Sequence, residues 1–195
     1  MKIEPITLEN EFVRLKPIGF EYLEPLCEAG LFEEIWRLNP TQVDSPEAMK
    51  NYIETALDEQ SRGVSLPFVT VEKSSGRIVG STRFGNIDPK NLRTEIGWTW
   101  ITPAWQKTYV NSAAKLLMLT HAFETWRCIR VELKTDVLNE KSRNAILRLG
   151  AKQEGIFRQH VICQSGRLRD TVYFSILDNE WQSVKENLLR KLGRI

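Results

Sequence analysis

The pattern of hydrophobic and polar positions divides the chain into alternating strand and helix segments. Alternation over residues 12–18 predicts a strand, and a short helix over residues 19–29 is expected to follow. A second helix is predicted to begin at Ser45, because a capping hydroxyl, a proline and an acidic residue follow one another there. Behind this start, apolar residues recur at helical spacing: Met49, Tyr52, Ile53, Ala56 and Leu57.

The middle of the chain predicts three strands and then a long helix. The strands are expected over residues 66–72, 76–87 and 92–101. A turn at Ser74-Ser75-Gly76 joins the first two. The helix is expected over residues 110–126, with the polar residues Asn111 and Ser112 at its start and leucines behind them.

The C-terminal part repeats the alternation of strands and helices. Its expected elements are a strand over residues 129–135, a helix over 139–150, strands over 153–163 and 168–177, and a terminal helix from Asp178. Asn139 is a capping residue and Gly150 a stop signal for the first of these helices.

This order of elements predicts the fold class. Strands joined by tight turns pair antiparallel, whereas the strand–helix–strand passage through residues 92–135 makes a parallel pair. We therefore expect residues 1–195 to form a single α/β (α+β) domain. Its core would be a mixed, mostly antiparallel twisted sheet of about seven strands with helices on both faces.

Composition and charge exclude several classes of protein. A hydrophobic fraction of 42% supports a packed core, and a net charge of +2 without a Lys/Arg block argues against a nucleic-acid partner. Three widely spaced cysteines, Cys27, Cys128 and Cys163, predict neither disulfides nor zinc, and indicate reduced thiols in the cytoplasm. No uncharged run is long enough for a membrane helix, and the N-terminus is no secretory signal. The two histidines, His121 and His160, lie too far apart in sequence to suggest a metal site.

The start of the long helix is the first candidate site. The first turn of a helix has spare backbone N–H groups, and the helix dipole attracts anions there. A phosphate cradle usually contains glycine, but residues 105–119 ("WQKTYVNSAAKLLML") contain none. The residues alone leave two readings open: a phosphate site, or a plain N-cap at Asn111 with Tyr109 in the core.

Three segments together resemble the GNAT acetyltransferase superfamily. They are "EIGWTWITPAWQKTYVNSAAKLLMLTHAFE", "NEKSRNAILRLGA" and "RDTVYFSILDNEW". Within the superfamily, the chain is most similar to the branch of the Rim-type ribosomal-protein N-terminal acetyltransferases, and the likeness extends from Phe12 to about Trp181. It implies a cytoplasmic N-acetyltransferase with acetyl-CoA as acyl donor. The residues themselves lead us to expect no metal and no membrane partner.

The resemblance also implies the residues that bind the cofactor. In the superfamily, a loop of the form Gln/Arg-x-x-Gly-x-Gly/Ala binds the pyrophosphate through its backbone. Gln106 matches the first position, whereas Tyr109 and Asn111 replace the small residues. We expect the Tyr109 ring to turn into a neighbouring hydrophobic layer. The implied cofactor-binding residues are Trp100, Ile101, Gln106, Lys107, Thr108, Tyr109, Val110, Asn111, Ser112, Asn139 and Asn144.

Glu95 is the candidate general base, because a carboxylate in a central strand can accept the proton of the acceptor amine. Strict alternation would place Glu95 on one face with Gly97 and Thr99, and Trp98 and Trp100 on the other, unless the strand contains a bulge. The alternative reading is a structural glutamate paired with Arg93 or Arg83.

Ser142 is the candidate general acid that would protonate the departing thiolate. The alternative reading makes Asn139 an ordinary cap and leaves Ser142 and Asn144 as surface residues. Trp36, beside Arg37, matches the position where the family builds its acceptor wall. Tyr173 is a further candidate for lining the acceptor site, and the alternative reading is a core or sheet-face tyrosine.

The identity of the acceptor stays open at this point. A protein N-terminus, a polyamine or an antibiotic amine would all fit, and so would a monomer or a homodimer. The rival interpretation is a catalytically degenerate CoA-binding or interaction module of the same fold.

Overall fold

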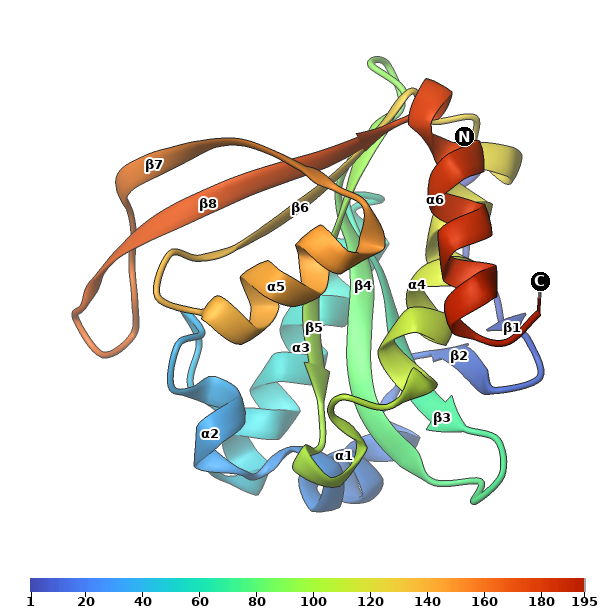
Figure 1. The fold of residues 1–195 in the computed structure, drawn as a ribbon. Coiled ribbons are helices and arrows are strands. Elements are labelled where there is room, and N and C mark those ends of the chain that lie inside the picture. Colours follow the sequence, from blue (N-terminus) through green and yellow to red (C-terminus); the bar gives the residue numbers. More distant parts are fainter. Residues whose placement is uncertain (195) are drawn as a thin grey trace.

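A computed structural model describes residues 1–194, which build one mixed sheet of eight strands with helices on both faces (Figure 1). The strands are β1 (Leu8–Glu9), β2 (Val13–Pro17), β3 (Leu66–Glu72), β4 (Ile78–Asp88), β5 (Arg93–Ile101), β6 (Arg130–Asp136), β7 (Lys152–Ile162) and β8 (Leu168–Leu177). The helices are α1 (Leu23–Gly30), α2 (Glu33–Trp36), α3 (Pro46–Ser61), α4 (Tyr109–Thr120), α5 (Glu140–Leu149) and α6 (Asp178–Lys191). The predicted fold class is confirmed.

The sheet has one strand more than predicted. The additional strand is β1, which pairs antiparallel with β2 through only two residues. Two residues are too few to produce a visible alternation of apolar and polar positions, so the sequence carried no signal for it.

Strand order is β1-β2-β3-β4-β5-β6-β8-β7, and within residues 1–194 only β5 and β6 pair in parallel. Their pairing joins residues 93–95 to residues 130–132 and then stops, although β5 continues to Ile101 and β6 to Asp136. Figure 1 shows β6 and β8 leaning away from β4 and β5 beyond this point. The sheet therefore opens into a gap between its two halves.

Two hydrophobic cores lie on opposite faces of the sheet. Helices α4, α5 and α6 cover one face, with Val110, Met118, Ile146 and Trp181 among their buried residues. Helices α1, α2 and α3 cover the other face, where Trp100 of β5 packs with buried residues of these helices.

The ends of several helices follow the predicted signals. Ser45 caps α3, since its hydroxyl accepts from the Ala48 amide at 3.2 Å. Asn139 caps α5, and Gly150 ends it with a left-handed φ of 106° that favours glycine. The predicted long helix over 110–126 is split: α4 ends at Thr120 and a π-helical turn continues to Thr125.

A β-bulge in β5 changes the predicted alternation. The ladder between β4 and β5 shifts between Ser81 and Arg83, and Trp98 takes a positive φ of 49°. Thr99 then turns toward α4, where its hydroxyl lies 2.7 Å from the Thr82 hydroxyl. Trp98 instead shares a face with Glu95, as its ring lies against Gly85, which pairs with Glu95. Strict alternation was therefore the wrong expectation.

Lys115 of α4 is buried beneath this bulge. Its ammonium nitrogen lies 2.6 Å from the Thr99 hydroxyl and 3.2 Å from the Thr82 hydroxyl, and no carboxylate of the described chain pairs with it. Burial lowers the pKa of Lys115 to about 7, because the charged form loses its hydration. The unfolded chain therefore binds more protons than the folded chain between pH 7 and about 10.5.

Lys115→Met should raise the free energy of unfolding at pH 7 and remove part of its pH dependence. In the unsubstituted protein, stability should increase from pH 7 toward pH 10, by at most about 1.4 kcal/mol per pH unit from this group. Urea unfolding at pH 7 and pH 9.5 measures both effects. The exposed lysine variant Lys141→Met is the control, and an equal pH slope in both variants would contradict the prediction.

Candidate active site

The start of α4 lies beside the open end of the gap between β5 and β6. Thr108 caps the helix: its hydroxyl accepts from the Val110 amide at 3.4 Å and donates to the Trp105 carbonyl at 2.8 Å. Lys107 takes a positive φ of 62° to make the turn. Asn111 and Ser112 lie inside the first turn, because the Thr108 hydroxyl begins the helix earlier, so the alternative reading of a cap at Asn111 is wrong.

Unpaired backbone amides gather at this helix start. No acceptor within the described chain has hydrogen-bonding geometry to the amides of Thr108, Tyr109 and Asn111. The loop is fixed from behind, since the Gln106 side chain donates to the Ile101 carbonyl at 3.0 Å. Free amides at the positive end of a 12-residue helix make an anion-binding site.

The Tyr109 side chain leaves this site on the side of β3. Its hydroxyl donates to Glu72 Oε1 at 2.7 Å, and its ring lies 5.3 Å from the Phe12 ring. The ring turns toward a hydrophobic neighbour as expected, but Tyr109 remains 36% exposed, so the expectation of a buried ring was wrong. Because β3 and β6 lie on opposite sides of β5 in the sheet, the ring does not cover the gap.

Glu72 receives several hydrogen bonds besides that of Tyr109. Burial raises the pKa of this carboxyl, but donors from Ser75, Ser74 and Tyr109 outweigh burial and lower the pKa to about 2. The same hydrogen bond raises the pKa of the Tyr109 phenol. Glu72 thereby anchors the tyrosine that stands where a glycine was expected.

Glu95 is buried on the sheet face that α3 covers. Its Oε2 accepts from Asn86 Nδ2 at 2.7 Å and pairs with Lys134 Nζ at 2.8 Å. The other oxygen, Oε1, has no partner among the described residues and faces Gly97, where a Cβ atom would approach it to 2.7 Å. Glu95 therefore keeps one free carboxylate oxygen.

The alternative partners that the sequence offered for Glu95 pair elsewhere. Arg83 binds Glu59, and Arg93 binds Asp88 and Glu132. The lysine that pairs with Glu95 comes from β6, a contact that only the sheet creates.

The start of α5 lies on the same sheet face as the start of α4, because both helices pack into one core. Asn139 Oδ1 accepts from the Ser142 amide at 3.0 Å, so the capping role proposed for Asn139 is observed. The Ser142 hydroxyl has no hydrogen-bond partner in the described chain. Asn144 is exposed on the following part of the helix.

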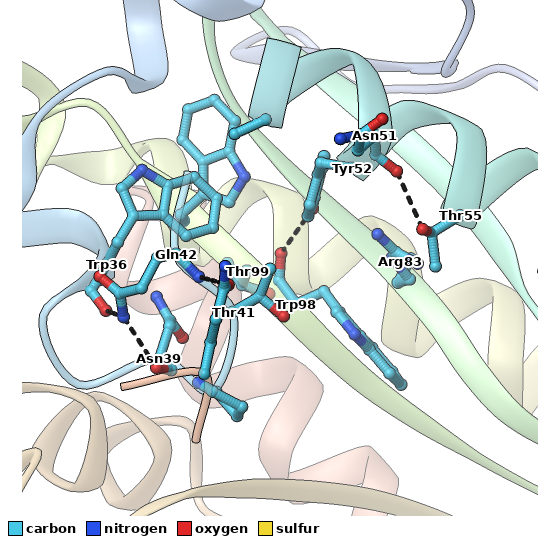
Figure 2. A pocket seen from close by; sticks show the side chains of 14 residues that line it. Trp36, Asn39, Thr41, Gln42, Asn51, Tyr52, Thr55, Arg83, Trp98 and Thr99 are labelled. Atoms are coloured by element: carbon cyan, nitrogen blue, oxygen red, sulfur yellow. Dashed lines mark hydrogen bonds between the residues drawn. The ribbon is translucent and has the colours of Figure 1, made fainter. Parts of the chain in front are cut away.

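A cavity of about 280 Å³ opens on the α3 face of the sheet (Figure 2). Its aromatic wall contains Trp36, whose indole donates to the Gly30 carbonyl at 2.7 Å, and Trp100, whose ring lies 5.7 Å from that of Trp36. The remaining lining residues are Asn39, Pro40, Thr41, Gln42, Ala48, Asn51, Tyr52, Thr55, Arg83, Trp98, Thr99 and Gln164.

The predicted site residues therefore separate into groups. Gln106–Ser112 gather at the start of α4, and Asn139 and Ser142 at the start of α5. Trp36 lines the cavity, and so does the Trp100 side chain, which had been assigned to the cofactor.

Glu95 and Tyr173 lie outside the cavity lining. The Tyr173 ring packs at 4.6 Å against Phe157, and Lys134 lies 5.7 Å from its centre. Because Lys134 also pairs with Glu95, Tyr173 and Glu95 share one sheet face.

Arg83, Gln42 and Gln164 were missed by sequence reasoning. The signal for Arg83 was a charged residue inside the otherwise uncharged strand segment "IVGSTRFGNI". No signal pointed to Gln42 or Gln164, which are 122 residues apart in the sequence. In the structure, Gln164 Oε1 accepts from the backbone N–H of Gln42 at 2.9 Å.

The described residues offer neither a metal-binding cluster nor a membrane-spanning helix. None of them form a group of three or more His, Cys, Asp or Glu able to hold a metal ion, and no described helix is long and apolar enough to span a membrane. Burial raises the pKa of the Cys128 thiol to about 11, so it is no activated nucleophile. His121 packs between aromatic rings.

Known protein sequences match this chain over much of its length. The profile of a family described as "Acetyltransferase (GNAT) domain" matches residues 13–152. "Uncharacterized N-acetyltransferase p20" of Bacillus licheniformis is 26% identical over 176 residues, covering 90% of this chain and 98% of that protein. "Putative ribosomal N-acetyltransferase YdaF" of Bacillus subtilis (strain 168) is 34% identical over 110 residues, covering 56% of this chain and 59% of that protein.

Comparison with solved structures gives the same fold. A GCN5-related N-acetyltransferase from Brucella melitensis superposes with a TM-score of 0.88 at 28% identity, over 96% of this chain and 85% of that one. Mycobacterium smegmatis RimJ in complex with CoA-disulfide superposes with a TM-score of 0.81 at 20% identity, over 97% of this chain and 96% of that one. At 20% identity, the second match shows the fold alone.

Tyr109→Phe should lower the free energy of unfolding at pH 7 by about 1 kcal/mol, because it removes the hydrogen bond to the Glu72 carboxylate. A depressed carboxyl pKa stabilises the fold above the unfolded value of 4.5, and this contribution is lost as pH falls toward 2. The difference between variant and parent should therefore shrink over that range.

Urea unfolding at pH 7 and pH 3 measures this difference. Tyr22→Phe is the matched control, since the Tyr22 hydroxyl has no hydrogen bond in the described chain. Equal losses in Tyr109→Phe and Tyr22→Phe would show that the Glu72 bond contributes nothing.

Proposed function

This chain belongs to the GNAT acetyltransferase family, as its motifs predicted, and on that basis we propose that it is an acetyl-CoA-dependent N-acetyltransferase. The proposed reaction transfers an acetyl group directly to a primary amine of a protein N-terminus or a small molecule. The relative YdaF is named as a putative ribosomal N-acetyltransferase, which agrees with the predicted likeness to the Rim-type branch.

One observation carries the proposal: the parallel pair β5–β6 opens beside a helix start with unpaired amides. A diphosphate needs several hydrogen-bond donors and a positive potential, and the start of α4 offers both. Tyr109 does not oppose this fit, because its side chain is bound to Glu72. Residues 106–112 would hold the pyrophosphate, and the open edge of β5 at Trp100 and Ile101 would hold the pantetheine arm.

Acetyl-CoA would supply the activated thioester, and residues of this chain would handle the protons. Glu95 would accept a proton from the attacking amine through its free oxygen, directly or through water. Ser142, whose hydroxyl is free, would donate a proton to the departing sulfur, and Asn144 would lie further along the arm. Backbone donors of β5 would stabilise the oxyanion.

The acceptor would enter from the α3 face of the sheet. The cavity beside Trp36 lies on the same face as Glu95, and Tyr173 flanks Glu95 from the side of β8. We expect the reaction to take place in the cytoplasm within one domain, consistent with three free cysteines. The rival interpretation, a degenerate module, would gain support if Tyr109 blocked the helix start where the family has glycine, but the Tyr109 side chain is bound to Glu72 instead.

Tyr109→Pro should weaken CoA binding by about tenfold relative to Tyr109→Ala. Both variants lose the bond to Glu72, but only proline also removes the backbone N–H. Proline is compatible with this position, because residue 109 is the first of the helix and Thr108 before it is extended. The loss of one charge-assisted donor is expected to cost about 1.5 kcal/mol or more.

Isothermal titration with CoA measures this difference, and thermal unfolding with and without CoA supports it. Equal affinities in the proline and alanine variants would remove the Tyr109 amide from the site. Failure of the unsubstituted protein to bind CoA at millimolar concentration would overturn the proposed function.

Glu95→Gln should lower turnover by about 10² to 10⁴ and leave CoA affinity unchanged, because only proton transfer is lost. Glu132→Gln is the matched control: Glu132 lies on neighbouring β6 and is also paired with cations. Steady-state rates are measured across pH with an acceptor found by screening an amine library. They test whether Glu95 is the general base. Equal rates in both variants would assign Glu95 a structural role.

A further inference from the structure

The acceptor cavity contains one charged side chain, Arg83, and no carboxylate. We propose that Arg83 binds a carboxylate of the acceptor, so that the substrate class is a primary amine that carries a carboxylate. This inference rests on the proposed acetyl transfer and specifies its acceptor.

Arg83 is held rigidly at the cavity wall. Its side chain is 2% exposed, and its Nη1 donates to Glu59 Oε2 at 2.9 Å. The guanidinium carbon lies 5.0 Å from the centre of the Tyr52 ring and 5.1 Å from that of Trp98. Figure 2 shows Arg83 between these two aromatic side chains. Glu59 and the two rings thus fix the direction of the guanidinium.

Most of the hydrogen-bonding capacity of Arg83 is unused. A guanidinium has five N–H donors, but Glu59 is the only acceptor that Arg83 reaches in the described chain. Its Nε is buried and has no hydrogen-bond partner among residues 1–194. An unpaired buried donor is costly, and a carboxylate is the group whose two oxygens match a guanidinium. The unused donors of a buried side chain at a cavity therefore point to an anionic ligand.

The rest of the lining agrees with this charge preference. The other polar groups are amides and hydroxyls, including Asn39, Asn51 and Thr55, which are neutral. A polyamine or an aminoglycoside would bring several positive charges to a lining that offers no carboxylate, since Glu59 lies behind Arg83 and is already paired with it. Unpaired charges are costly where water is excluded. The cavity therefore disfavours two of the three acceptor classes that the sequence left open.

Arg83 is also suitably placed with respect to Glu95. Arg83 pairs with Gly97 across the β4–β5 ladder, and Gly97 lies against Glu95 Oε1. A carboxylate held at Arg83 would therefore bring a nearby amine close to the strand that carries the proposed base.

Intrinsic fluorescence tests the proposal without CoA or turnover, since Trp36, Trp98 and Trp100 line the cavity. The probes are L-amino acids compared with their carboxamides, and Asp-Gly-amide compared with Asn-Gly-amide. The first pair tests a free α-carboxylate and the second an acidic side chain of a peptide N-terminus. At least one carboxylate should bind tenfold or more tightly than its neutral partner.

Three variants test whether Arg83 is the group that binds the carboxylate. Arg83→Gln should abolish the preference for the carboxylate, and Arg83→Lys should keep part of it. Glu59→Gln removes the competing anion, so it should tighten carboxylate binding severalfold, which a purely structural arginine would not do. Circular dichroism confirms that each variant is folded.

Equal binding of acids and amides, an unchanged preference in Arg83→Gln, tighter binding of spermidine, or no saturable binding of any carboxylate below 10 mM would each overturn the inference. CoA titration of the same samples separates the two proposals. Intact CoA binding without a carboxylate preference rejects only the acceptor class, whereas absent CoA binding rejects the acetyltransferase itself.

Discussion

Parallel pairing between β5 and β6 lasts for three residue pairs, and the arrangement of the candidate site depends on where it stops. Up to Glu95 the two strands form one continuous sheet. Beyond it, β5 follows β4 while β6 follows β8, so the sheet opens between two halves that each remain well paired. The open edge of β5, the start of α4 and the start of α5 all border this opening.

The bulge at Trp98 distributes side chains around the opening. One extra residue in β5 sends Thr99 to the α4 face and leaves Trp98 on the face of Glu95. Trp98 can then cover Arg83, while Lys115 approaches the Thr99 hydroxyl from the other side. A single irregularity in one strand thus shapes the wall of the cavity on the α3 face and also brings the Thr99 hydroxyl to the buried amine of Lys115.

At position 109, a tyrosine whose side chain is anchored to Glu72 stands where the family motif has glycine. A glycine at position 109 would leave the helix start clear because it has no side chain, whereas Tyr109 leaves it clear because its hydroxyl is bound to Glu72. The carboxylate that anchors it comes from β3, and serines of the following turn stabilise its charge. The loss of glycine in the motif therefore does not remove the backbone donors.

Sequence patterns were sufficient to predict the order of the elements apart from β1 and α2, the caps at Ser45 and Asn139, the parallel β5–β6 neighbours and the family. Each of these depends on local periodicity, on capping chemistry or on residues close together in the chain. Four features became visible only in the folded chain: the partner of Glu95, the anchor of Tyr109, the two-residue strand β1 and the cavity around Arg83. These features join residues that lie far apart in the sequence, as when Lys134 meets Glu95 and Gln164 meets Gln42. Such contacts exist only once the strands have found their register, because a one-residue bulge reverses the face of every following side chain.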